Sequence, residues 1–178
     1  MGFKKSVKAN IKKAAIRSPS VAIDIDGAIR GPMPESIPPQ LATLVKEAPT
    51  GTGWVQEVKF DGYRMLCRIE NGEVRIISRS GKDWTDQFSA VAIEAAKLEV
   101  ETAWLDGEIV VLGADGRSSF QALHNVLSSL GARGQLYYCV FDIPYVNGYD
   151  LRNSSLLDRK KVLEGRATRA SSLRKRAE

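Results

Sequence analysis

Long hydrophobic runs, histidine and cysteine are all scarce in this chain. No apolar run approaches the roughly 18 residues of a membrane-spanning helix, which excludes a membrane span. The single histidine, His124, lies in a helical pattern, and we assign it no catalytic role. The two cysteines, Cys67 and Cys139, lie far apart in apolar runs with no secretory signal before them. We therefore expect reduced, buried thiols in a cytoplasmic protein.

Acidic residues are missing from the start of the chain, so the net charge of +5 is unevenly distributed. Residues 1–17 carry +6 and residues 165–178 carry +4, which leaves −5 for the chain between them. Basic ends attract phosphate, but acid-poor ends are as often simply disordered, and a targeting peptide is a third interpretation of residues 1–17. We divide the chain into a flexible, basic, Pro/Gly-containing segment at 1–31, one domain at 32–164, and a basic disordered tail at 165–178.

The pattern of apolar residues predicts an α+β fold. Strands are expected at 54–60, 63–69, 73–79, 102–112 and 135–143, with Asn71-Gly72 turning a hairpin and Asp106-Gly107 interrupting the fourth strand. Helices are expected at 86–98 with Asp86 as cap, at 119–130 with Ser118 or Ser119 as cap, and at 155–164, with a helical turn or two at 38–45. Strands and helices alternate without a βαβ rhythm, which favours a mainly antiparallel sheet with flanking helices.

The stretch EVKFDGYR, residues 57–64, combines residue types that a hydrophobic core does not need. A lysine becomes a nucleophile when burial or a neighbouring positive charge lowers its pKa, and Arg64 follows Lys59 closely enough to supply such a charge or to hold a phosphate. Asp61 offers a carboxylate, and Gly62 allows close approach of a ligand. A solitary lysine is usually just a solvated residue, but this four-residue pattern arises by chance only about once in a hundred thousand positions. The combination indicates a nucleotide site.

This stretch resembles the nucleotidyltransferase motif of the ATP-dependent DNA ligases, which RNA ligases and mRNA capping enzymes share. Five further stretches are similar to the ligase branch, in the right order: PPQLATLV, IISRSGKDWT, WLDGEIVVL, SFQALHNVL and YYCVFDIPYVNGYDLR. The resemblance covers roughly residues 32–164 and is to the adenylation domain of bacterial end-joining ligases of the ligase D type. It implies an ATP-grasp-like nucleotidyltransferase fold and repair of nicked or broken double-stranded DNA with other end-joining proteins, in the bacterial cytoplasm at the nucleoid.

The resemblance also implies roles for particular residues. Lys59 would attack the α-phosphate of ATP to form a lysine–AMP intermediate, with Mg²⁺ or Mn²⁺ as the metal. The nucleotide contacts implied are Glu57 and Phe141 at the adenine, Arg64 and Arg79 at the ribose or phosphates, and Glu108 at a ribose hydroxyl. Asp61 and Glu108 are the implied metal ligands. Structural alternatives exist: Phe141 as a core residue, Glu108 as a bulge carboxylate facing water, and Arg79 as a turn residue.

The family pattern breaks off after the last predicted helix. Ligases of this family carry a later Glu-Gly motif ending in lysine, a strand with paired lysines that contact the phosphates, and usually an OB-fold domain. Glu164-Gly165 follows the helix too soon to be that motif, so we expect a fold that is incomplete at the C-terminus and has no OB-fold domain. The alternatives to ligase activity are an inactive truncated remnant or a basic nucleic-acid-binding fragment.

Overall fold

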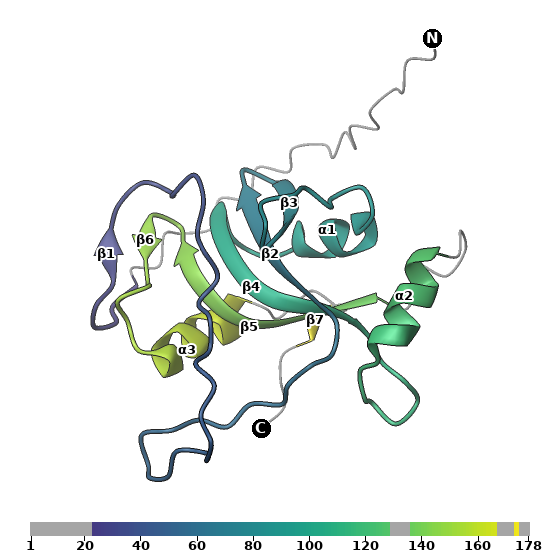
Figure 1. Ribbon diagram of the computed structural model, residues 1–178. Coiled ribbons are helices and arrows are strands. Elements are labelled where there is room, and N and C mark those ends of the chain that lie inside the picture. The colour runs from purple at the N-terminus through teal and green to yellow at the C-terminus, as the bar shows by residue number, and fades with distance from the viewer. Residues whose placement is uncertain (1–22, 129–135, 167–172, 175–178) are drawn as a thin grey trace.

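A twisted sheet forms the centre of the molecule in the computed structural model, which describes residues 23–128, 136–166 and 173–174 (Figure 1). The strands in these residues are β1 (Ile29–Arg30), β2 (Tyr63–Glu70), β3 (Glu73–Ser78), β4 (Thr102–Val111), β5 (Leu136–Val146), β6 (Tyr149–Asp150) and β7 (Leu173–Arg174). Their order is β1-β6-β5-β4-β2-β3, with every pair antiparallel, and β7 pairs in parallel with β5. The predicted α+β class with a mainly antiparallel sheet is confirmed.

The hairpin predicted around Asn71-Gly72 is present as β2 and β3. Asn71 and Gly72 have φ angles of 50° and 86°, the left-handed conformations that a two-residue hairpin turn requires. The predicted strand at 102–112 is also present as β4, and its register with β5 shifts on either side of Asp106. Gly107 is needed there because a Cβ atom would lie 2.6 Å from the ring of Tyr138 on β5.

The three helices of the described residues are α1 (Ser89–Ala95), α2 (Phe120–Ser128) and α3 (Leu156–Arg166). The prediction that Asp86 caps the first helix is wrong, because α1 begins after Phe88, which makes no side-chain capping bond to the residues described. Ser119 does cap α2: its Oγ accepts a hydrogen bond from the Ala122 N–H at 3.3 Å. Residues 129 and 130, predicted at the end of this helix, lie outside the described residues.

Several predicted segments differ from the structure. Residues 54–60 form no strand and residues 38–45 no helical turn; both belong to an irregular stretch between β1 and β2. Residues 29–30 pair with β6 although we expected a flexible segment there, and Ile23 and Ile25 pack against the core. In the expected disordered tail, Gly165 and Arg166 complete α3 and residues 173–174 form β7, while the remainder lies outside the described residues.

The two faces of the sheet carry separate apolar clusters. The larger cluster joins one face to all three helices through Val91, Leu123, Leu163 and many strand residues. The smaller one, on the other face, joins Leu66, Trp104 and Tyr145 to Met33 and Ile37 of the irregular stretch. Both cysteines are free and buried, as predicted. No helix in the described part of the chain is long and apolar enough to span a bilayer.

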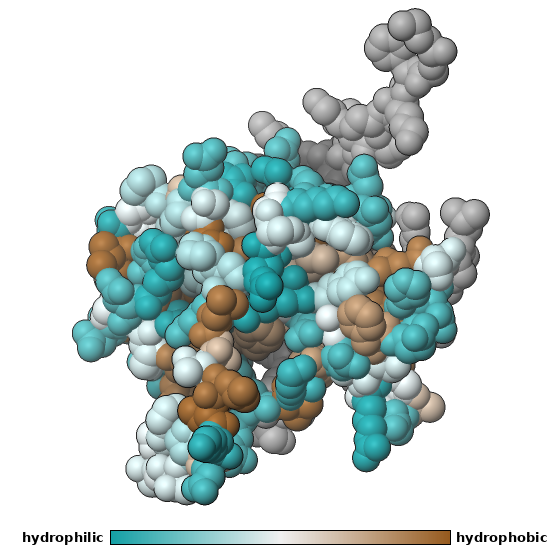
Figure 2. All heavy atoms as spheres, in the orientation of Figure 1, coloured by the Kyte–Doolittle hydropathy of each residue, from teal (hydrophilic) through white to brown (hydrophobic). Residues whose placement is uncertain are grey.

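The irregular stretch between β1 and β2 crosses the face of the smaller cluster. The Trp104 indole N–H donates to the Pro34 carbonyl at 3.0 Å, and the Tyr145 hydroxyl donates to the Gly31 carbonyl at 3.0 Å. Beyond Gln40 the stretch leaves the sheet and loops outward at the lower left of Figure 2, where hydrophobic side chains gather at the surface. The large apolar residues exposed there are Leu41, Leu44, Val45, Trp54, Val55 and Val58.

Candidate active site

Cross-strand register brings three charged residues onto the face of the smaller cluster. Arg64 on β2 lies opposite Glu108 on β4, and Leu66 lies opposite Asp106. Side chains directly opposite each other in an antiparallel pair project from the same face, and residues two apart in a strand share a face. Arg64, Asp106 and Glu108 therefore point to the side that the irregular stretch crosses. Two of them, Arg64 and Glu108, were predicted as site residues.

Arg64 is held in place by an ion pair that the sequence did not predict. Its Nε and Nη2 donate to the two carboxylate oxygens of Asp106 at 3.1 and 2.8 Å, and Nη2 also donates to the Gln40 carbonyl at 2.7 Å. The hydrogen bonds that Arg64 donates to Asp106 raise the pKa of Arg64, while burial is the main cause of the raised pKa of Asp106. The guanidinium carbon lies 5.4 Å from the ring centroid of Phe141.

Phe141 reaches this arginine because of a bulge in β5. Asp106 pairs with Asp142 and Gly107 pairs with Val140, so Phe141 falls between them without a partner of its own in the described part of β4. An extra residue of this kind bends the strand and redirects its side chain. The bulge explains how Phe141 stands over Arg64 while Val140 and Asp142 on either side of it are buried. Phe141 itself is partly exposed.

Two hydrogen bonds fix the chain on the C-terminal side of Lys59. The Asp61 N–H donates to Ser118 Oγ at 2.8 Å, and Asp61 Oδ2 accepts from the Phe120 N–H at the start of α2 at 3.1 Å. The next residue, Gly62, approaches β4 so closely that a Cβ atom would lie 2.2 Å from the Ile109 carbonyl oxygen. Only glycine fits at this contact, so the Asp-Gly pair has a structural reason as well as a chemical one.

Glu108 lies beside this segment, and the charge of Lys59 affects its pKa. The Gly62 N–H donates to its Oε1 at 3.0 Å. Partial burial raises the pKa of Glu108, and the Gly62 hydrogen bond and the positive charge of Lys59 oppose that rise. Lys59 itself is exposed, in the irregular stretch just before β2. The positive charge of Lys59 is thus near enough to act on the Glu108 carboxylate.

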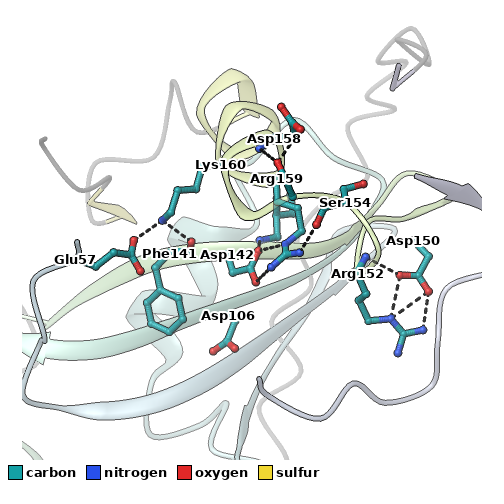
Figure 3. Close-up of polar contacts among 12 residues, drawn as sticks. Glu57, Asp106, Phe141, Asp142, Asp150, Arg152, Ser154, Asp158, Arg159 and Lys160 are labelled. Atoms are coloured by element: carbon teal, nitrogen blue, oxygen red, sulfur yellow. Dashed lines mark hydrogen bonds and ion pairs between the residues drawn. The ribbon is translucent and has the colours of Figure 1, made fainter. Parts of the chain in front are cut away.

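Glu57, on the N-terminal side of Lys59, contacts helix α3 (Figure 3). Its Oε1 lies 2.5 Å from the Nζ of Lys160, and the same Nζ donates to the Phe141 carbonyl at 2.8 Å. The strand predicted at 54–60 would have placed Glu57 and Lys59 on one face, but no strand forms there. Lys160 was not predicted as a site residue. Its position in an ordinary helix of mixed charge gave no sequence signal for this contact.

A buried ion pair beneath Phe141 was also missed by the sequence. The Arg159 Nε and Nη2 donate to the two oxygens of Asp142 at 2.7 and 3.0 Å, and Nη1 donates to the Ser154 carbonyl at 2.7 Å. Figure 3 shows this pair between α3 and the bulged part of β5. The remaining predicted site residue, Arg79, is exposed in the turn after β3. Because Met65 pairs with Ser78, Arg79 lies one position beyond the paired strands, at the same end of β2 as Arg64.

The two predicted metal ligands retain free oxygens. Asp61 Oδ2 and Glu108 Oε1 accept backbone hydrogen bonds, whereas Asp61 Oδ1 and Glu108 Oε2 accept none from the described residues. Across residues 23–128, 136–166 and 173–174, no group of three or more His, Cys, Asp or Glu residues is arranged to hold a metal ion. Mg²⁺ is usually bound by one or two carboxylates together with substrate phosphates and water, so a pair of this kind fits that ion.

Comparison with known proteins identifies the family. Residues 36–174 match the ATP dependent DNA ligase domain, and the chain belongs to that family. It is 46% identical over 133 residues to the multifunctional non-homologous end joining protein LigD of Pseudomonas aeruginosa, and 35% identical over 138 residues to LigD of Mycobacterium tuberculosis. These segments cover 75% and 77% of this chain but only 16% and 18% of the two relatives, so the chain spans less than a fifth of their length.

Solved structures agree with the family assignment. The ligase domain of M. tuberculosis LigD matches with a TM-score of 0.56 and 35% identity, over 68% of this chain and 39% of that one. A mycobacterial DNA ligase D complexed with ATP and MES matches with a TM-score of 0.55, also at 35% identity, over 68% of this chain and 38% of that one. The predicted ligase nucleotidyltransferase fold is thereby confirmed.

Proposed function

We propose that this chain transfers AMP from ATP to Lys59, the first step of ATP-dependent DNA joining. The observation that carries the proposal is the joint position of Lys59, Glu108 and Arg64 at one end of the sheet, within a chain that belongs to the ATP-dependent DNA ligase family. The relative solved as a complex with ATP supports ATP as the nucleotide. GTP, which capping enzymes use, is disfavoured because the relatives and solved structures compared above are ligases.

The proposed reaction forms one bond and breaks another at the α-phosphate. The neutral amine of Lys59 attacks the α-phosphorus, a nitrogen–phosphorus bond forms, and the bond from that phosphorus to the pyrophosphate oxygen breaks. The amine loses a proton, and pyrophosphate leaves with the bonding electron pair. The 5′-phosphate at a DNA break then takes AMP from Lys59, and a 3′-hydroxyl displaces AMP to seal the strand.

The other residues have roles in binding and orientation. Arg64, held by Asp106, faces the phosphates or ribose with a guanidinium whose direction is fixed before the nucleotide binds. Phe141 offers an aromatic face for the purine, and Glu57 lies near the base. Arg79 contacts a phosphate of AMP or of the nick. The arrangement supports these assignments because the Arg64 guanidinium lies over the Phe141 ring, Lys160 bonds both Glu57 and the Phe141 carbonyl, and Arg79 lies at the same end of β2 as Arg64.

Asp61 and Glu108 would hold Mg²⁺ or Mn²⁺ through their free oxygens. When bound, the metal ion neutralises the charge that builds up on the departing pyrophosphate. The protein's own contribution is to anchor one oxygen of each carboxylate with a hydrogen bond from a backbone N–H. Without a cation these carboxylates would repel a triphosphate, which is a further reason to expect a metal requirement.

We infer that the substrate is nicked or broken double-stranded DNA in bacterial double-strand break repair, with other end-joining proteins as partners. The names of the similar proteins, which refer to non-homologous end joining, support this inference. A cytoplasmic location at the nucleoid follows from that role. The basic residues of segments 1–17 and 165–178 would supply sequence-independent attraction to the phosphate backbone.

The test is covalent labelling of the 178-residue chain with ATP carrying ³²P at the α-phosphate, in the presence of Mg²⁺. We expect acid-labile label on the wild type and on Lys46→Ala, which removes an exposed lysine of the same irregular stretch, and none on Lys59→Ala. No label on any of the three would refute the proposal and favour an inactive remnant. Labelling by GTP instead of ATP would favour a capping-type activity.

A further inference from the structure

The side chain of Lys160 in α3 touches both the segment that carries Lys59 and the strand that carries Phe141. Its Nζ lies 2.5 Å from Glu57 Oε1 and 2.8 Å from the Phe141 carbonyl oxygen, and the side chain is only 20% exposed. The neighbouring Lys161 differs sharply. It is 73% exposed and pairs with Asp158 of its own helix. Two adjacent lysines of one helix therefore have unlike environments.

The segment around Lys59 pairs with no strand, so side-chain contacts such as the one with Lys160 hold it in place. Residues 54–60 form no ladder hydrogen bonds with the sheet, so their position is set by side-chain and isolated backbone contacts. On the C-terminal side of Lys59, Asp61 is bonded to Ser118 and Phe120. On the N-terminal side, an ion pair between Glu57 and Lys160 joins the segment to α3. Lys59 lies between these two attachments.

The second bond of Lys160 reaches the β5 bulge. Phe141 pairs with no residue of β4, and its carbonyl oxygen accepts a hydrogen bond from the Lys160 ammonium. One ammonium group thus sets the separation between the backbone that carries Phe141 and the segment that carries Lys59. Reaction rates depend steeply on such separations, because a displacement of about 1 Å can cost on the order of a hundredfold in rate.

We propose that Lys160 is a positioning residue for AMP transfer: through Glu57 and the Phe141 carbonyl it holds Lys59 at a fixed distance from the nucleotide-binding strand. This inference rests on the proposed function for its catalytic consequence. The geometric consequence, an ordered segment at residues 57–59, stands on the contacts alone. Lys160 is not expected to touch the nucleotide.

The test compares Lys160→Met with the matched control Lys161→Met. At saturating ATP we expect Lys160→Met to slow AMP transfer about tenfold with less than about a threefold change in the ATP concentration for half-maximal rate. Lys161→Met should behave as wild type, and Lys160→Arg should restore most of the rate, because a guanidinium can also bond both oxygens.

A second readout needs no nucleotide. The ¹⁵N backbone order of residues 57–59, measured by NMR relaxation, should fall in Lys160→Met and stay unchanged in Lys161→Met, at equal melting temperature. If wild type takes no label from ATP, the proposed function fails and the NMR comparison alone decides this inference. Unchanged order in Lys160→Met, or equal effects of the Lys160 and Lys161 substitutions on rate, would overturn it.

Discussion

The ion pair between Arg159 and Asp142 should be a major determinant of stability, and it can be tested without any nucleotide. The two side chains are 8% and 11% exposed and share two hydrogen bonds of 2.7 and 3.0 Å. The Arg159 guanidinium also donates to the Ser154 carbonyl, and Asp142 Oδ1 accepts from the Ile143 N–H at 2.8 Å. Each charge is therefore well satisfied by the other, and removing either one leaves an uncompensated charge in the interior.

The expected magnitude follows from that burial. Breaking a buried ion pair by removing one partner costs about 3–5 kcal/mol. We expect this loss for Arg159→Met and for Asp142→Asn. Because 1 kcal/mol shifts the melting temperature of a chain of this size by about 2–4 °C, the fall should be on the order of 6–20 °C. The double variant Asp142→Leu, Arg159→Met should recover at least half of the loss, since neither charge remains to be solvated.

The assay is thermal and urea unfolding followed by circular dichroism, with an exposed pair as control. Arg152 and Asp150 have the same two-oxygen geometry, but the arginine side chain is 47% exposed. Arg152→Met should therefore cost less than about 1 kcal/mol. Equal losses for Arg159→Met and Arg152→Met would refute the argument from burial. A double variant no more stable than Arg159→Met would show that packing, and not the buried charge, accounts for the effect.

Two further predictions concern the site. Gly62→Ala should lower the free energy of unfolding by about 1–3 kcal/mol in urea titrations and reduce AMP transfer, because its Cβ would lie 2.2 Å from the Ile109 carbonyl oxygen; wild-type stability would contradict the close approach. Burial raises the pKa of Glu108, so the folded chain binds that proton more tightly than the unfolded chain, and the resulting stability is lost as pH rises from about 4.5 through the raised pKa. Glu108→Gln should therefore flatten that part of the pH–stability curve and be at least as stable as wild type at neutral pH, yet lose at least about tenfold in AMP transfer. Lower stability of Glu108→Gln at neutral pH would contradict this reasoning.

The elements that the sequence predicted well are those with local signals. Asn71-Gly72 determines the hairpin through its own backbone preference, and Ser119 caps α2 within one turn. The strand predicted at 54–60 fails for a nonlocal reason. Alternation of apolar and polar residues permits a strand, but a strand also needs a neighbour, and no described strand lies next to this segment. Trp54 and Val58, which would share one face of such a strand, are both exposed.

The same distinction applies to the site. Lys59, Arg64 and Glu108 stand out in the sequence because each belongs to a short motif. Asp106 and Lys160 do not, because their roles depend on which strands are neighbours, on the register, and on the bulge that displaces Phe141. Asp106 belongs to the Asp106-Gly107 pair that was predicted to interrupt a strand. Only the pairing of Leu66 with Asp106, however, shows that the Asp106 carboxylate can reach Arg64.

Two acidic residues near the site, Asp142 and Glu108, show how structural and functional carboxylates differ in this fold. Asp142 has a buried guanidinium as its partner, and its charge is what makes the buried Arg159 tolerable. Glu108 has no buried guanidinium partner among the described residues. One of its oxygens accepts a hydrogen bond from a backbone N–H, which a glutamine oxygen could accept equally well. Burial disfavours the charged form of the carboxylate. Burial thus opposes the negative charge at position 108 more than Lys59 and Arg64 favour it, whereas a bound metal ion would favour that charge further. A charge that is unfavourable for folding and lies beside the candidate nucleophile is best explained by the chemistry of the site.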